Sequence, residues 1–376
     1  MLSQNLFFSF DEIYFIKYIF IFLLSFFTCF FIIYLSRKYP NFLDKNFKGC
    51  QKYHTFPTPR LGGVGIYISS FVGLISSNIF LKLIFSSSLA FISGIFSDIS
   101  KELSPKFRIL FISISAFLGI FLTNFYINNL DFVTLNKFLG ILLTFIGILG
   151  FTNAINIIDG FNGLAGGFSL IALLNFLFTA FFYNNIFLMD IISIFIFSIL
   201  GFFILNFPFG LIFLGDGGAY FLGYMFSFLC IYIKNLLPQI SALYPFLVLI
   251  YPIYEVIFSI YRKVKRKTSP FKPDTYHFHM LVYKSIKKFL RRKYAKNFSK
   301  ESALYFLKYH KDIKDNIDFL ANPLTSIFIF LWLLPFQILA FLFKTNSGIL
   351  FICSLIFIFY YNLTYKLLVM YLKNKI

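Results

Sequence analysis

Three aspartates stand where apolar stretches begin or end: Asp98, Asp159 and Asp216. A carboxylate at the mouth of an apolar segment is costly unless a cation pairs with it. Mg²⁺ is bound by one or two carboxylates together with phosphate oxygens. Asp216, which is flanked by glycines in the stretch FLGDGG, suits that role. We therefore predict that the three aspartates converge on a single divalent ion, held by Asp216 and Asn156, and serve metal-assisted phosphoryl transfer.

A polar loop at residues 153–167, NAINIIDGFNGLAGG, separates two apolar stretches. Asn153, Asn156 and Asp159 recur at roughly helical spacing and can share one face. Amides and a carboxylate there are suited to the donor and acceptor edges of a nucleobase or sugar. Glycine turns leave backbone N–H groups free for phosphate oxygens. The loop, including Asn162, therefore predicts a nucleotide-sugar site.

Basic and imidazole side chains accompany the aspartates. Arg60, in the stretch PTPRLGG, offers a planar fork to phosphate, and the glycine pair after it lets the backbone approach a ligand closely; a stiff turn between two spans is the alternative. The stretch PFKPDTYHFH carries His277 and His279, and it follows Arg266. Two histidines without a further ligand nearby do not predict zinc, so we expect them to contact a pyrophosphate or orient an aspartate.

Two polar or aromatic positions keep a second interpretation. Asp98 can pair with a basic residue that follows it, and the candidates are Lys101, Lys106 and Arg108. Phe213 can stack on a base, but in a chain with 60 phenylalanines it can equally face lipid.

The composition identifies the elements that position these residues. Of the 376 residues, 59% are hydrophobic and 13% charged, with a mean hydropathy of +0.80. Soluble domains carry about a quarter charged residues, so the solvent of this chain is lipid. We expect an all-α polytopic integral membrane protein. Runs of ~20 apolar residues predict eleven spans at 14–35, 64–82, 84–97, 108–126, 138–157, 164–182, 187–206, 218–236, 240–260, 324–343 and 349–371.

The basic residues predict the orientation. Eleven spans place 29 of the 34 Lys and Arg on one side, which is the cytoplasm by the positive-inside rule. The N-terminus is then outside and the C-terminus cytoplasmic, with the polar motifs on the cytoplasmic face. The net charge of +19 is topological, so no nucleic acid is expected as a partner. We divide the chain into a catalytic core (1–261), a basic loop with the histidine motif (262–323, helical around 281–296 and 299–318) and a C-terminal helix pair (324–376).

At these motifs the sequence resembles the polyprenyl-phosphate N-acetylhexosamine-1-phosphate transferase family. The likeness runs from about residue 55 to 282 and covers PTPRLGG, NAINIIDGFNGLAGG, FLGDGG and PFKPDTYHFH in order. It implies ten or eleven helices in the bacterial inner membrane, an active site facing the cytoplasm, and Mg²⁺, with Mn²⁺ as the alternative ion. It also implies a UDP-N-acetylhexosamine donor and undecaprenyl phosphate as acceptor.

The resemblance also implies residue roles. Asp216 holds the metal, and Asp98 deprotonates or positions the acceptor phosphate. The nucleotide and sugar site is lined by Asn153, Asn156, Asp159 and Asn162. His277 and His279 contact the donor pyrophosphate. As a separate hypothesis, we predict that the acceptor phosphate is held by Lys106, Arg108 or Arg60.

The chain departs from the family pattern at three positions: Ser97 and Asn162 replace aspartates, and Met280 replaces a histidine. With Ser97 in place of an aspartate, the site has one carboxylate fewer to bind a metal or act as a base. The PTPR stretch and the His-x-His pattern favour the N-acetylhexosamine branch, which begins O-antigen or other envelope glycans with release of UMP. The phospho-N-acetylmuramoyl-pentapeptide transferases of peptidoglycan synthesis are the alternative within the family. Homodimerisation stays open.

Two readings from other classes remain. A transporter or flippase would place charges between helices at mid-membrane, and Glu255 is the main candidate, with Asp190 near the outer face. An inactive scaffold descended from the enzyme is the other, because Ser97 stands where an aspartate is usual.

Overall fold

The computed structural model describes residues 2–39, 43–44, 57–100, 104–268, 274, 276–295 and 311–374. Apart from the antiparallel two-residue strands β1 (Leu43–Asp44) and β2 (Thr58–Pro59), its regular elements are helices. They are α1 (Leu2–Lys38), α2 (Gly62–Gly73), α3 (Asn78–Ser100), α4 (Pro105–Thr123), α5 (Lys137–Ile158), α6 (Leu164–Phe182), α7 (Ile186–Asn206), α8 (Gly215–Leu236), α9 (Leu243–Val248), α10 (Ile250–Lys265), α11 (Phe278–Ala295), α13 (Lys311–Leu342) and α14 (Ser347–Lys373). Within the described ranges, nine helices are long and apolar enough to cross a membrane. The protein is therefore an all-α polytopic membrane protein.

Three predicted spans were wrong in their boundaries. The spans 64–82 and 84–97 are replaced by the short helix α2 and the longer α3, because the chain turns at Leu74–Ser77. The predicted span 240–260 is divided into α9 and α10. Pro252 cannot donate a hydrogen bond to the carbonyl of Val248, and the Gln337 side chain of α13 donates to that carbonyl instead, at 2.9 Å.

The predicted cytoplasmic loop is helical at its two ends. α11 covers most of the stretch expected at 281–296, whereas much of the helix expected at 299–318 lies outside the described residues. α13 begins at Lys311 and continues past residue 323, so the predicted boundary at 323/324 falls inside one helix.

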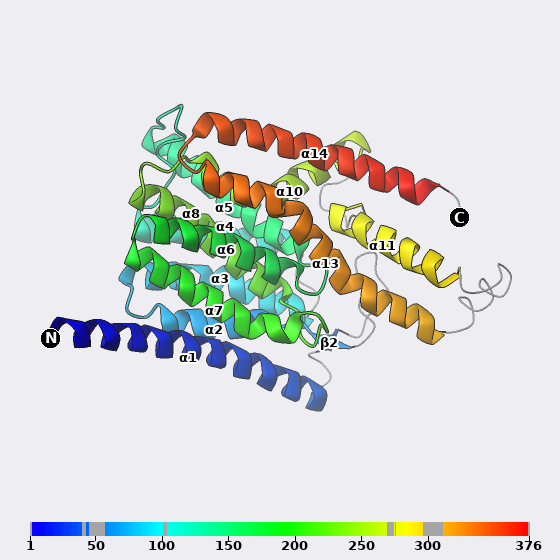
Figure 1. The fold of residues 1–376 in the computed structure, drawn as a ribbon, viewed down its shortest axis with the longest axis horizontal. Coiled ribbons are helices and arrows are strands. Elements are labelled where there is room, and N and C mark those ends of the chain that lie inside the picture. Colours follow the sequence, from blue (N-terminus) through cyan, green and yellow to red (C-terminus); the bar gives the residue numbers. More distant parts are fainter. Residues whose placement is uncertain are drawn as a thin grey trace.

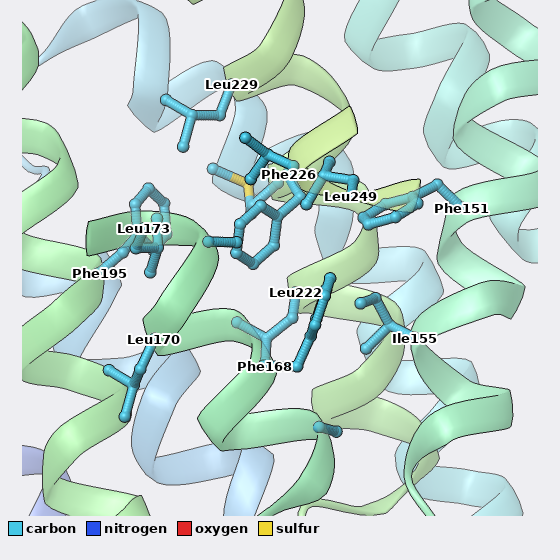
Figure 2. Packing of buried hydrophobic residues seen from close by; sticks show 14 of the residues in the cluster. Phe151, Ile155, Phe168, Leu170, Leu173, Phe195, Leu222, Phe226, Leu229 and Leu249 are labelled. Atoms are coloured by element: carbon cyan, nitrogen blue, oxygen red, sulfur yellow. The ribbon is translucent and has the colours of Figure 1, made fainter. Parts of the chain in front are cut away.

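The long helices lie side by side with their axes roughly aligned, and the described chain begins and finishes at opposite ends of the bundle (Figure 1). α8 is buried along most of its length, and it packs against α2, α3 and α5. Figure 2 shows buried apolar side chains that α8 shares with α5, α6, α7 and the junction of α9 and α10. The cluster includes Phe151, Ile155, Phe168, Leu170, Leu173, Phe195, Leu222, Phe226, Leu229 and Leu249.

Glycines allow the first turn of α8 to approach its neighbours closely. A Cβ atom on Gly63 of α2 would lie 2.2 Å from the Cα of Gly218, and one on Gly94 of α3 would lie 2.3 Å from the backbone nitrogen of Gly217. Backbones can come this close only without side chains between them. The expectation that the glycine pair of PTPRLGG approaches a ligand was wrong, because Gly62 and Gly63 are buried against α7 and α8.

Candidate active site

Asp216 in the first turn of α8 is the centre of a polar cluster at one end of the bundle. One of its carboxylate oxygens accepts a hydrogen bond from Asn156 of α5 at 2.9 Å and lies 3.3 Å from Arg60. The other accepts from Ser97 of α3 and from Arg108 of α4, both at 2.9 Å. Arg60 follows β2, so the cluster joins the β2–α2 connection to four helices.

Asp98 lies beside this cluster, with a side chain only 2% exposed. The backbone N–H of Gly217 donates to its Oδ2 at 3.2 Å, and Arg60 Nε stands 3.4 Å from its Oδ1. Among the described residues, Oδ1 has no hydrogen-bond donor. The sequence named Lys101, Lys106 and Arg108 as candidate partners of Asp98. The structure places Arg60 beside Asp98 and pairs Arg108 with Asp216, so the candidate Arg108 was wrong. Lys101 lies outside the described residues.

Gly215 is required where Asp98 and Arg60 meet. Its backbone has a φ of 78°, which favours glycine. A Cβ atom there would lie 2.0 Å from the carbonyl oxygen of Arg60 and 2.6 Å from Oδ2 of Asp98. A side chain at this position would separate the two loops that bring the carboxylates together.

Asp159 follows the last turn of α5 and faces the same cluster. Burial raises the pKa of Asp159 to about 7; the positive charge of Arg60 opposes this rise, the negative charge of Asp216 adds to it, and the backbone N–H of Gly215 lowers it. Asp98, Asp159 and Asp216 thus come from three separate stretches and share one site.

The side-chain oxygens of the cluster can hold Mg²⁺ only if phosphate oxygens of the substrate supply its remaining ligands. In the described part of the chain, no three His, Cys, Asp or Glu side chains group closely enough to hold a metal. A site of one or two carboxylates suits Mg²⁺ when phosphate oxygens supply the rest. Asp216, the amide of Asn156 and the donor-free Oδ1 of Asp98 meet that requirement.

The two histidines of the fourth motif are buried next to the loop that carries Asp159. His277 Nδ1 lies 2.8 Å from Glu255, and His279 Nδ1 lies 3.3 Å from the hydroxyl of Tyr251. His279 packs edge-on against the ring of Phe161, and its Nε2 would be 3.6 Å from a Cβ on Gly160. Burial lowers the pKa of His279 to about 3, so this imidazole is neutral at pH 7. The histidine motif therefore packs against the loop that follows Asp159, on one side of the carboxylate cluster.

Five other predicted residues lie at the margin of the cluster or outside it. The side chain of Asn153 donates to the carbonyl of Leu149 in its own helix at 2.7 Å. Arg266 lies over the ring of Tyr276 at 4.4 Å, and Lys106 is exposed in the first turn of α4. Phe213 is half-buried, and its backbone bonds to Pro59 and Gly62. Asn162 bonds to Asn322 of α13 and to the carbonyl of Pro208, which follows α7. Of the predicted set, Arg60, Asp98, Asn156, Asp159 and Asp216 are brought together.

The glycine loop is held internally. The N–H of Asn162 donates to Asn322 and its side chain to the Pro208 carbonyl, at 2.8 and 2.9 Å, and the N–H of Gly163 donates to Asn206 at 2.7 Å. The expectation that these glycine turns leave N–H groups free for phosphate was wrong at these positions, because neighbouring helices use them.

Sequence reasoning missed two partners. It treated Ser97 as a lost aspartate, but its hydroxyl donates to Asp216. It treated Glu255 as a transport residue, but the carboxylate holds His277. The position of Ser97 next to Asp98 was a signal for the first, whereas nothing in the local sequence pointed to the second.

Part of the chain is similar in sequence to known proteins. A family model described as glycosyl transferase family 4 matches residues 80–234. A probable undecaprenyl-phosphate N-acetylglucosaminyl 1-phosphate transferase of Bacillus subtilis is 29% identical over 240 residues, which cover 61% of this chain and 66% of that protein.

Two phospho-N-acetylmuramoyl-pentapeptide-transferases match shorter stretches. The Dictyoglomus turgidum protein is 30% identical over 186 residues (47% of this chain, 60% of that protein). The Rubrobacter xylanophilus protein is 33% identical over 172 residues (45% and 50%). The matches span about two thirds of these relatives' length or less. The stretch that the family model matches carries Asp98, Asp159 and Asp216, so this part of the chain is similar to glycosyl transferase family 4.

Proposed function

We propose that this protein transfers an N-acetylhexosamine-1-phosphate from a UDP-sugar to undecaprenyl phosphate and releases UMP, as the first membrane step of an envelope glycan such as O-antigen. The observation that carries the proposal is Asp216, held by Arg60, Ser97, Arg108 and Asn156 beside Asp98. The similarity to the Bacillus subtilis protein extends over 240 residues, against 186 and 172 for the two muramoyl-pentapeptide transferases. This favours N-acetylglucosamine over the muramoyl-pentapeptide as the transferred group.

The reaction is an in-line displacement at phosphorus. An oxygen of the lipid phosphate attacks the sugar-bearing β-phosphorus of the donor. The bond between that phosphorus and the bridging oxygen breaks, and UMP leaves with the bridging oxygen and its electron pair. The product is a lipid-linked pyrophosphoryl sugar. Because the acceptor phosphate is already ionised at neutral pH, no covalent enzyme intermediate is required.

The residues of the cluster position and neutralise the reactants. Arg60 and Arg108 supply guanidinium forks that match phosphate geometry, and both already face Asp216. Asp98 lies where it can position the acceptor phosphate, and Asp159 lies at the loop proposed for the nucleotide and sugar. Mg²⁺, held by Asp216 with Asn156, would neutralise charge on the donor pyrophosphate.

The membrane arrangement supports an acceptor with a long prenyl chain. We infer eleven passes by counting α2 and the α9–α10 pair as crossings. The carboxylate cluster and the basic helix α11 would then share one side, and the positive-inside rule favours the cytoplasm for that side. A mostly apolar cavity of about 350 Å³ lies between α5, α8 and α9, and Gly147, Phe151 and Leu249 line it. A cavity of this size suits isoprene units.

The test uses purified protein, Mg²⁺, undecaprenyl phosphate and a panel of UDP-N-acetyl sugars, with released UMP as the measurement. We expect turnover with at least one sugar. Asp216→Asn should retain less than about 1% of that turnover, because the carboxylate proposed to hold Mg²⁺ is lost. Asp190→Asn is the matched control, since Asp190 pairs with Lys17 outside this site. Near-normal turnover in Asp216→Asn would refute the assignment of Asp216.

A further inference from the structure

Glu255 of α10 is a completely buried carboxylate that the proposed reaction does not use. A buried charge is costly unless several polar groups satisfy it. Oε1 lies 2.8 Å from Nδ1 of His277, and Oε2 accepts a hydrogen bond from the hydroxyl of Tyr361 at 2.8 Å. The backbone N–H of Phe278 is shared between both oxygens at 3.2 and 3.3 Å.

The direction of these bonds determines the state of His277. The Phe278 N–H can only donate, and the Tyr361 hydroxyl donates to a carboxylate. An ionised carboxylate has no proton to offer, so the bond to His277 requires the proton on Nδ1. Glu255 thereby selects the form of His277 in which Nδ1 carries hydrogen.

The segment between α10 and α11 is held at a second point by the same two helices. Arg262, one turn of α10 beyond Ser259, is paired with Asp274, and the Ser259 hydroxyl donates to the same carboxylate at 3.3 Å. Tyr365 of α14, one turn after Tyr361, donates to the backbone carbonyl of Tyr276 at 3.2 Å. The C-terminal helix α14 therefore contacts the histidine motif directly.

We propose that Glu255 and Tyr361 are positioning residues, which fix the proton of His277 and hold the histidine motif against the α5–α6 loop for recognition of the donor pyrophosphate. The effect on the donor rests on the proposed function, whereas the proton position does not. The ring of His277 stacks on that of His279 at 5.4 Å with 4° between the planes, so a change at Glu255 is transmitted to the imidazole that packs beside Gly160.

Kinetics give the first test. Glu255→Gln keeps the shape of the side chain but loses the charge, and we expect the KM for the UDP-sugar to rise about tenfold or more, as when outer partners of a histidine are lost. Tyr361→Phe removes one donor to the buried carboxylate and keeps the ring. It should give a smaller rise in KM, with a Tm lowered by the loss of one hydrogen bond to a charged group. Tyr360→Phe, the same change one residue away on α14, has its ring against Trp332 and should leave KM unaltered.

The proton position gives a second test that needs no substrate. The chain contains four histidines, so ¹⁵N-histidine labelling yields few signals, and His277→Asn assigns that of His277. We expect a protonated Nδ1 in the wild type and in Tyr360→Phe, and loss of that signature in Glu255→Gln. An unprotonated Nδ1 in the wild type, or the same His277 signal and donor KM in Glu255→Gln, overturns the proposal. Absence of UMP release from the wild-type protein would instead count against the proposed function. The proton position on His277 is measured without substrate, so it still tests the role of Glu255 in that case.

Discussion

Ser97 shows how one side chain changes the chemistry available to the cluster. Its hydroxyl donates to Asp216 at 2.9 Å, where a second aspartate would place another negative charge. The site therefore holds Asp98, Asp159 and Asp216 against Arg60 and Arg108, and it depends on substrate phosphates to complete a cation site. Ser97 is a partner that orients Asp216.

Removing this hydroxyl tests that role. Ser97→Ala should lower kcat/KM about tenfold, the equivalent of one hydrogen bond to a charged group, with little change in Tm. Ser100→Ala is the control, because its hydroxyl donates to the carbonyl of Phe96 on the exposed side of the same helix. Unchanged kinetics in Ser97→Ala would contradict the orienting role. A wild-type protein without turnover that becomes active as Ser97→Asp would support the inactive-scaffold alternative.

Asp159 predicts a dependence of stability on pH. Its pKa is raised to about 7 by burial, whereas the unfolded chain ionises near ~4. Between these values the folded state binds more protons, so the contribution of Asp159 to stability falls as pH rises from about 4 to 7. In substrate-free protein, Asp159→Asn should therefore raise the Tm more at pH 8 than at pH 5. Equal shifts at the two pH values would contradict the raised pKa.

At the scale of elements, glycine-mediated contacts of α8 with α2 and α3 decide where the aspartates meet. The contacts Gly63–Gly218 and Gly94–Gly217 bring the first turn of α8 against both helices. Arg60 precedes α2, and Asp98 lies in the last turn of α3. The close packing of α2 and α3 on α8 therefore brings both side chains next to Asp216. In both contacts a glycine of the FLGDGG stretch meets a glycine from a distant part of the chain: Gly63 of PTPRLGG or Gly94 of α3.

A side chain at the first contact should separate the helices. In Gly63→Ala the new Cβ would meet backbone at 2.2 Å, and overpacking of this kind costs about 1–3 kcal/mol. We expect a lower Tm and reduced turnover together. Gly150→Ala is the control, because nothing lies within 4 Å of a Cβ there. A Gly63→Ala protein as stable as Gly150→Ala would contradict the close approach.

At the scale of the whole molecule, the carboxylate cluster and the apolar cavity lie at different depths along the helix bundle. The carboxylate cluster lies at the end of the bundle near β2 (Figure 1). The cavity of about 350 Å³ is bordered by Lys234 in the last turn of α8 and by Asn129 in the connection between α4 and α5. This separation suits an acceptor with a charged head and a long apolar tail.

Filling the cavity tests the link to the acceptor. Gly147 lines the cavity and has free space at its Cβ, so Gly147→Leu should fill it and lower kcat/KM for undecaprenyl phosphate about tenfold. A farnesyl phosphate acceptor, whose tail is much shorter, should be affected less. Gly150→Leu, one turn along α5 and outside the cavity lining, is the matched control. Equal losses with both acceptors would contradict a role for the cavity in chain binding.

The sequence by itself determined the lipid solvent, the helical class and the identity of the acidic residues at the span ends, because hydropathy and the cost of a charge near lipid are local properties. It did not determine pairing between helices. The contacts of Arg60 with Asp98, and of Tyr361 with Glu255 across 106 residues, depend on which faces of distant helices meet. Only the tertiary structure decided those contacts, because close packing at glycines and the satisfaction of buried charge act between elements.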